Sequence, residues 1–166
     1  MKTLNEFEIF QNKALGAHMI WEFAKNYQMY HVDKVPPSLL LTMPVLPLCF
    51  NKRVILGIKE RNFNGGSLLR TLDENKDLFS GLQERMEGMA RLTLESIYLG
   101  SAVKLIEYDR QNALIIPISK TLPIKIRDSI SKNYDYSDII NTSRRIGAWF
   151  GQFNQSEILL YFNLHF

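Results

Sequence analysis

Several residue types and patterns that carry chemistry are scarce in this 166-residue chain. It has one cysteine, Cys49, which excludes an intrachain disulfide and a cysteine-rich zinc site. The histidines His18, His31 and His165 lie far apart, without the i, i+3 or i+4 spacing of paired metal ligands. Phosphate-binding loops of the GxxxxGK(S/T) or GxGxxG type are missing, as is the GxSxG frame of a nucleophilic serine. The sequence therefore predicts no catalytic, cofactor-binding or metal-binding residue.

Long apolar runs are also missing. No stretch reaches the roughly 18 apolar residues of a membrane-spanning helix. The first ten residues carry Glu6 and Glu8 where a signal peptide needs an apolar run. The lone cysteine fits a reducing compartment. We therefore expect a cytoplasmic protein that does not contact a membrane. The net charge of +3 permits an acidic partner without requiring one.

Apolar residues with helical spacing predict the first elements. A helix is expected over 12–30, where apolar side chains recur at i, i+4 and i+8. The most apolar segment, 39–50, contains Pro44 and Pro47, so we expect a short helix that is kinked or broken near them. Ser38 is a candidate N-cap for that helix.

Glycines divide the next helical region. Ser67 follows a turn signal and is expected to cap a helix over 68–75. A long helix is expected over 77–99, with Gly100 as its C-terminal stop. The alternative is a break near Gly81, because glycine lowers helix stability by about 1 kcal/mol relative to alanine.

After the long helix the apolar period changes from 3.6 to 2. Two β-rich runs, 103–108 and 113–117, flank the polar turn 109–112 and predict a β-hairpin. A last helix is expected over 138–153, followed by an apolar tail at 156–166.

This order of elements predicts the fold class. We expect a mainly helical α+β protein, a winged-helix-like domain with one β-hairpin and flanking helices. The whole chain, 1–166, is expected to form a single domain. Its parts are an N-terminal helix (12–30), a winged-helix-like core (38–118), and a C-terminal helix with an apolar tail (137–166).

Large apolar side chains crowd the C-terminal end of the chain. An exposed tail of this kind is unfavourable in water, so it must pack on the domain or on a partner. Aromatic anchors are typical of interface hot spots. Two interpretations remain open: these residues fill the core alone, or they also form a partner surface. The residues predicted to bind a partner are Trp149, Phe150, Leu160, Tyr161 and Phe162.

Cationic side chains gather in two parts of the chain. Those predicted to contact DNA or another acidic surface are Lys52, Arg53, Lys59 and Arg61. A second group follows the hairpin, and its members are Lys120, Lys125, Arg127 and Lys132. Direct contact with DNA and a solvated or protein-facing surface both remain open. Arg145 is predicted to be structural, with a packed stem and a paired head.

Three short motifs, taken in order, resemble one known family over roughly 12–153. They are LPL at 46–48 followed by Lys52-Arg53, LG at 99–100 before the hairpin, and RIGAWF at 145–150. In this order and spacing they resemble the middle component of bacterial three-component ABC-ATPase systems, which include the Lamassu anti-phage group. One departure is Gly57-Ile58-Lys59, where relatives tend to carry a leucine-proline step.

The resemblance implies a non-enzymatic accessory subunit without a cofactor. Such a subunit would bridge an SMC- or Rad50-like ABC ATPase and an effector subunit, often a nuclease, and would regulate the effector. The assembly would recognise invading DNA, so DNA contact would come through the complex. The resemblance carries no catalytic residue over to this chain. The alternative hypothesis is a free-standing winged-helix DNA-binding transcriptional regulator.

Overall fold

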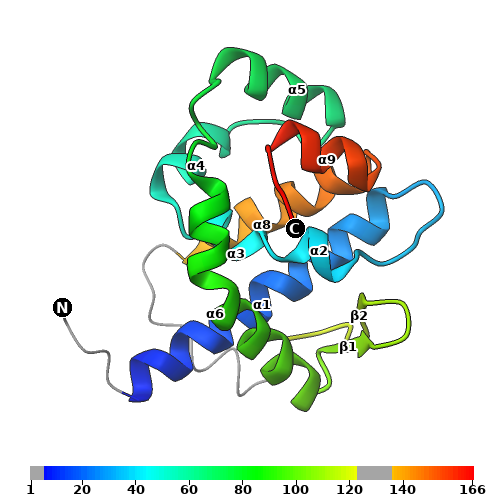
Figure 1. Cartoon of the computed structure of the whole chain (residues 1–166). Helices are drawn as coiled ribbons and strands as arrows, with labels where there is room; N and C mark the ends of the chain where they lie inside the picture. Colours follow the sequence, from blue (N-terminus) through cyan, green and yellow to red (C-terminus); the bar gives the residue numbers. More distant parts are fainter. Residues whose placement is uncertain (1–5, 123–135) are drawn as a thin grey trace.

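The computed structural model describes the backbone of residues 6–122 and 136–166, and the side chains of residues 12–122 and 136–166. The predicted mainly helical α+β class with one hairpin is confirmed, whereas the winged-helix arrangement is not. Figure 1 shows the helices surrounding a common centre, with the hairpin at one side. The elements are α1 (Glu6–Tyr30), α2 (Leu39–Thr42), α3 (Val45–Cys49), α4 (Lys52–Ile58), α5 (Gly65–Glu74), α6 (Leu82–Ala102), β1 (Ile106–Asp109), β2 (Leu114–Pro117), α8 (Tyr136–Gly151) and α9 (Gln155–Tyr161).

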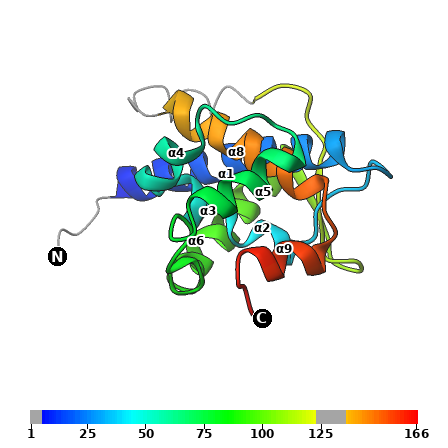
Figure 2. The same cartoon turned by 90° about the horizontal axis from the view of Figure 1, so that it is seen from above.

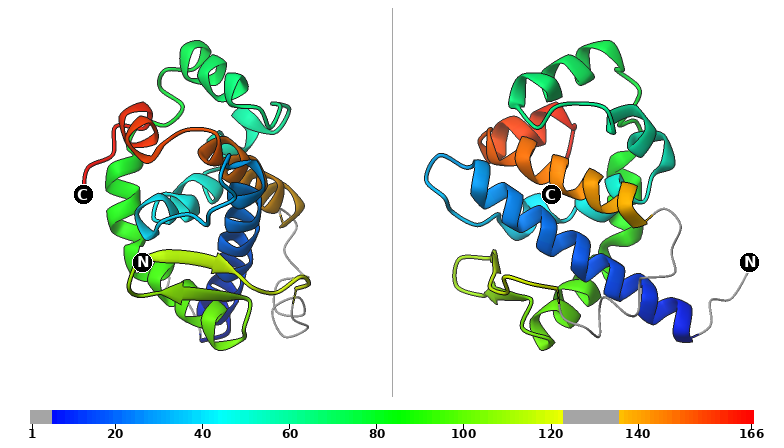
Figure 3. Two further views of the ribbon diagram at one scale, coloured as in Figure 1. Left: turned by 90° about the vertical axis from the view of Figure 1, so that its right-hand side faces the viewer. Right: turned by 180° about the vertical axis from the view of Figure 1, so that it is seen from behind.

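Helices α1 and α8 run parallel and in close contact along the centre of the protein (Figures 2 and 3). Small residues at every fourth position of α8 face backbone carbonyls at every fourth position of α1. In order along both helices, the pairs are Ser143 with Met19, Gly147 with Phe23, and Gly151 with Tyr27. The Ser143 hydroxyl donates a hydrogen bond to the Met19 carbonyl. The absence of side chains at the two glycines is what lets the two backbones approach.

The prolines divide segment 39–50 as predicted. Helix α2 ends at Thr42, Pro44 is the N-cap of α3, and Pro47 lies within the first turn of α3, where its missing N–H costs nothing. The hydroxyl of Ser38 caps α2 by accepting a hydrogen bond from the Leu41 N–H at 3.3 Å, which confirms that prediction. All five residues of α3 are buried, so this segment forms part of the core.

The part of the chain that the structure describes contains no single helix that is long and apolar enough to cross a membrane. One bent pair, Leu39–Cys49 with Lys52–Ile58, has sufficient length and apolar content across a bend of 95°.

The predicted bounds of α5 and α6 were wrong, and α6 also continues past the predicted stop at Gly100 to Ala102. Helix α6 begins at Leu82, because Gly81 adopts a left-handed backbone with φ of 74° that ends the preceding turn. The break near Gly81 is therefore the correct alternative to a helix from residue 77. Helix α5 begins at Gly65, and its cap is Asn64, whose side chain accepts a hydrogen bond from the Ser67 N–H at 2.9 Å.

Strands β1 and β2 form the predicted antiparallel hairpin, with Ile106 opposite Pro117. The carboxylate of Asp109 accepts hydrogen bonds from the N–H groups of Gln111 and Asn112, which stabilises the turn. The edge of β2 that does not pair with β1 bonds to the start of α2 and the segment before it. The N–H of Ile115 donates to the Pro37 carbonyl, and the N–H of Leu39 donates to the carbonyl of Ala113, just before β2. The hairpin is thereby attached to the helices.

Candidate functional site

The two aromatic residues of α8 that were predicted to bind a partner lie in the core. Trp149 and Phe150 are fully buried. The indole Nε1 of Trp149 donates a hydrogen bond to the Asn62 carbonyl at 2.8 Å. The Phe150 ring packs edge-on against Phe23, with 5.7 Å between ring centroids. The structure therefore removes both from the partner surface, because α1 covers one side of α8 and the segment before α5 covers another.

The predicted residues of the tail divide between core and surface. Helix α9 begins with a capping box in which the Asn154 and Glu157 side chains each accept a hydrogen bond from the other's backbone N–H, which fixes where the helix starts. Phe162 is buried and contacts Phe150, so it too leaves the predicted surface. Tyr161 is half-buried, and Leu160 is 77% exposed. Of the five residues predicted to bind a partner, only Leu160 and part of Tyr161 are accessible at the surface.

The RIGAWF motif holds the loop between α4 and α5. Arg145 is buried, and its Nε and Nη2 donate to the carbonyls of Arg61 at 2.8 Å and Lys59 at 3.0 Å. The guanidinium also lies 5.0 Å from the ring centre of Phe63. Gln152, directly after α8, donates to the Phe63 carbonyl at 2.7 Å. The predicted structural role of Arg145 is confirmed, and the motif organises the fold.

The first cationic group lies on α4 and the loop after it. Lys52, Arg53 and Lys59 are exposed. Arg61 is half-buried and forms an ion pair with Glu74, with Nη2 and Oε2 2.5 Å apart. Three of the four predicted cations are therefore accessible, and the fourth is engaged within the fold. In the second group Lys120 is exposed, whereas Lys125, Arg127 and Lys132 lie outside the described residues.

A buried polar cluster joins α1 to α8, and the sequence interpretation missed it. The carboxylate of Glu22 receives Arg144 Nε at 2.9 Å and Nη2 at 3.0 Å. His18, one turn earlier on α1, places Nε2 3.5 Å from the same carboxylate, and its Nδ1 lies 2.8 Å from the Tyr136 hydroxyl. The i, i+4 spacing of His18 and Glu22 is the signal that could have indicated a shared polar face.

Two opposing effects set the protonation state of Glu22 in this cluster. Burial of Glu22 favours its neutral form and by itself would raise the pKa. Hydrogen bonds from His18 and Arg144, with the positive charges of Arg144 and Lys25, together outweigh burial and lower the pKa of Glu22 to about 2. The carboxylate is therefore charged at neutral pH, and the cluster is a paired contact between helices. Burial raises the pKa of the Tyr136 hydroxyl, with a further contribution from the charge of Glu22.

Other reactive groups stay apart in the fold. Residues 12–122 and 136–166 contain no group of three His, Cys, Asp or Glu side chains placed to hold a metal ion. Cys49 is fully buried, and this burial raises the pKa of its thiol well above the usual range. The thiol is thus a core group.

The structure is that of a helical protein. Its described polar clusters join its own helices, and its described surface carries exposed apolar and cationic side chains. The chain belongs to the family described as ABC-three component (ABC-3C) system Middle Component 3, whose model matches residues 1–165. The predicted resemblance to the middle component of these systems is confirmed. The chain matches none of the curated proteins and none of the solved structures with which it was compared.

Proposed function

We propose that this middle component is a non-enzymatic accessory subunit of a bacterial anti-phage defence complex in the cytoplasm. It bridges an SMC- or Rad50-like ABC ATPase, as in Lamassu systems, and an effector subunit such as a nuclease, and it regulates that effector. The observation that carries the proposal is the match of the family model over residues 1–165. A middle component of a three-component system has two further components to contact.

The C-terminal helix supplies one contact in this proposal. Leu160 is 77% exposed at the surface of α9, beside the half-buried Tyr161. The capping box and the buried Ile158 and Phe162 hold α9 on the core, so Leu160 is presented on a fixed element. An apolar side chain on a rigid helix can bind a partner without a large loss of conformational entropy.

The cations of α4 supply a second contact. Lys52, Arg53 and Lys59 project into solvent and are suited to an acidic surface, either DNA held by the complex or the effector. Neutralising Lys52 and Arg53 together should weaken such a contact at low salt and have a smaller effect at high salt, because screening already reduces the attraction.

Reconstitution with the two other components of the system tests the proposal. The three purified proteins should form one complex in size-exclusion chromatography. Leu160→Asp should weaken the complex, whereas Val32→Asp places the same charge at a position that is 86% exposed and serves as the control. If the wild-type chain elutes separately from both other components, the accessory role is refuted. Tight binding of duplex DNA by the isolated chain would then favour the regulator hypothesis.

A further inference from the structure

A groove lies between the second half of α6 and strand β1, and none of its lining residues belongs to α4 or α9. It has a volume of about 780 Å³, which is within the range of ligand-binding clefts. Ile97 and Ile106, both buried, contribute to its lining. Three other lining side chains are large, apolar and exposed, namely Leu94 at 50%, Tyr98 at 78% and Ile118 at 43%. The groove is therefore an apolar surface that an intermolecular contact could cover.

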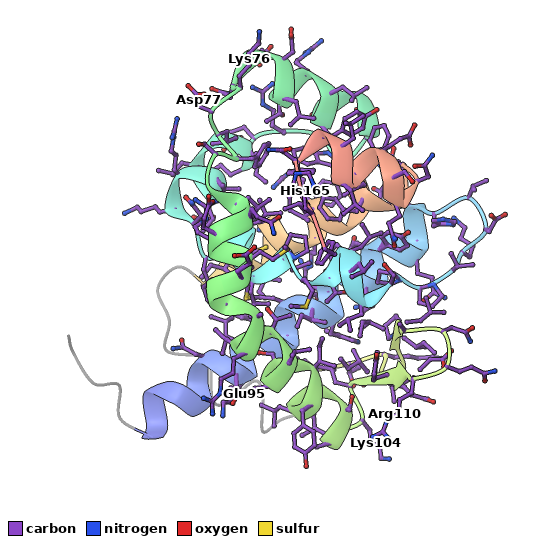
Figure 4. All side chains as sticks on the ribbon, in the orientation of Figure 1. Lys76, Asp77, Glu95, Lys104, Arg110 and His165 are labelled. Carbon is purple, nitrogen blue, oxygen red and sulfur yellow. The ribbon has the colours of Figure 1, made fainter. Side chains whose placement is uncertain are left out.

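Two cations line this groove. Lys104 follows α6 and Arg110 follows β1, and Figure 4 labels both near the end of α6 and the hairpin. Both are exposed, and neither forms an ion pair with another side chain in the described part of the chain. Glu107 also lines the groove, so the charged rim carries a surplus of positive charge.

The backbone at Lys104 is unusual for a lysine. Its φ is 62°, in the left-handed region that favours glycine. The turn that requires this φ closes α6, with Lys104 N–H bonded to the Ser101 carbonyl at 3.2 Å and Leu105 N–H to the Gly100 carbonyl at 2.9 Å. Glycine would adopt this backbone conformation at a lower free energy than lysine does, but only lysine places a cation at the groove. A cation also interacts favourably with the C-terminal end of a helix dipole, and the Lys104→Gly variant separates the two roles.

We propose that this groove binds a segment of another component of the system that carries large apolar side chains next to acidic ones. The inference rests on the proposed function and specifies the chemistry of one of its partners. The apolar walls exclude water around the partner's apolar side chains, and the two cations complement its carboxylates. Tyr98 is the expected anchor, because tyrosine side chains often dominate interface energies.

Affinity measurements on the reconstituted system test the groove. Tyr98→Ala should weaken binding to one component at least about fivefold, which is the loss expected for an interface anchor. Lys104→Gly should weaken the same binding about two- to fivefold at low salt, and less at high salt. Its melting temperature should equal or exceed that of the wild type, because glycine relieves the backbone. Val32→Ala truncates an apolar side chain outside the groove, so its affinity should match that of the wild type.

A photo-crosslinking amino acid at position 98 identifies the bound segment. The crosslinked peptide should come from another component and should contain apolar and acidic side chains. Crosslinks to a second copy of this chain, or to a segment without acidic residues, would overturn the inference. The inference would also be overturned if the complex forms and both groove variants bind with wild-type affinity. That result would not contradict the accessory role. Failure of the wild-type chain to join the complex refutes the proposed function instead. A lower melting temperature of Lys104→Gly with unchanged affinity assigns the lysine to closing α6, against the proposal.

Discussion

Replacing Gly147 by alanine should destabilise the protein, because α8 and α1 meet there backbone to backbone. An added Cβ would lie 2.4 Å from the Phe23 carbonyl oxygen and 3.1 Å from the Asn26 Cβ. The carbonyl belongs to the middle of α1 and cannot rotate away like the end of a flexible side chain. The two helices must therefore separate, and their contacts on both sides of the substitution weaken.

The magnitude follows from two opposing effects. Overpacking of a close contact costs about 1–3 kcal/mol and sometimes more, and a clash with backbone belongs at the upper end. Alanine recovers about 1 kcal/mol of helix propensity relative to glycine. We expect a net loss of about 2 kcal/mol, which for a chain of this size lowers the melting temperature by about 4–8 °C.

Gly88→Ala on α6 is the matched control, because no atom lies within 4 Å of the added Cβ. That variant should gain up to about 1 kcal/mol from propensity alone. Urea unfolding followed by circular dichroism and by tryptophan fluorescence measures both variants, since Trp149 lies in the core next to the altered contact. Equal stability of Gly147→Ala and the wild type would falsify the close-packing argument. A loss of stability in both variants would refute the propensity argument.

Further predictions concern buried polar groups. The ionised Glu22 stabilises the fold above its ordinary pKa of 4.5, and this contribution is lost as the pH falls towards its folded pKa of about 2. The free energy of unfolding should therefore fall by up to about 3 kcal/mol between pH 5 and pH 2, and Glu22→Gln should lack this part of the acid dependence in denaturation series at several pH values. Arg145→Lys keeps the charge but cannot bond both the Lys59 and Arg61 carbonyls with one planar group, so urea unfolding should show a loss of about 2 kcal/mol, and wild-type stability would contradict the role assigned to the guanidinium. The buried thiol of Cys49 should react with a chromogenic disulfide reagent only in denaturant, and rapid reaction of the native protein would show that the core around α3 opens.

Local patterns predicted most of the elements because their causes are local. The polar turn that contains Asp109 bonds its own backbone, and proline stops or starts a helix through its own ring. The break at Gly81 stood among the alternatives, since a left-handed φ is the ordinary reason for glycine at a helix end. The cap at Asn64 was missed because Ser67, three residues later, is an equally good capping residue by type.

The partner surface could be predicted only in part. The aromatic residues of α8 and the tail form one apolar group in the sequence, and nothing in their spacing separates Trp149 from Leu160. The structure places the first in the core and the second at the surface, because α1 and the loop before α5 cover α8. The Glu22–Arg144 pair was likewise beyond local patterns, since its members are 122 positions apart in the sequence.

The amino-acid sequence alone determined the helical periods, the hairpin, the helix breaks and the family to which the chain belongs, all of which depend on neighbouring residues or on the order of short motifs. Tertiary structure alone decided which aromatic side chains remain accessible, which charges are paired, and that α6 and β1 enclose an apolar groove. The physical reason is that burial and pairing depend on what packs opposite a side chain, and in this fold the opposing groups come from distant parts of the chain.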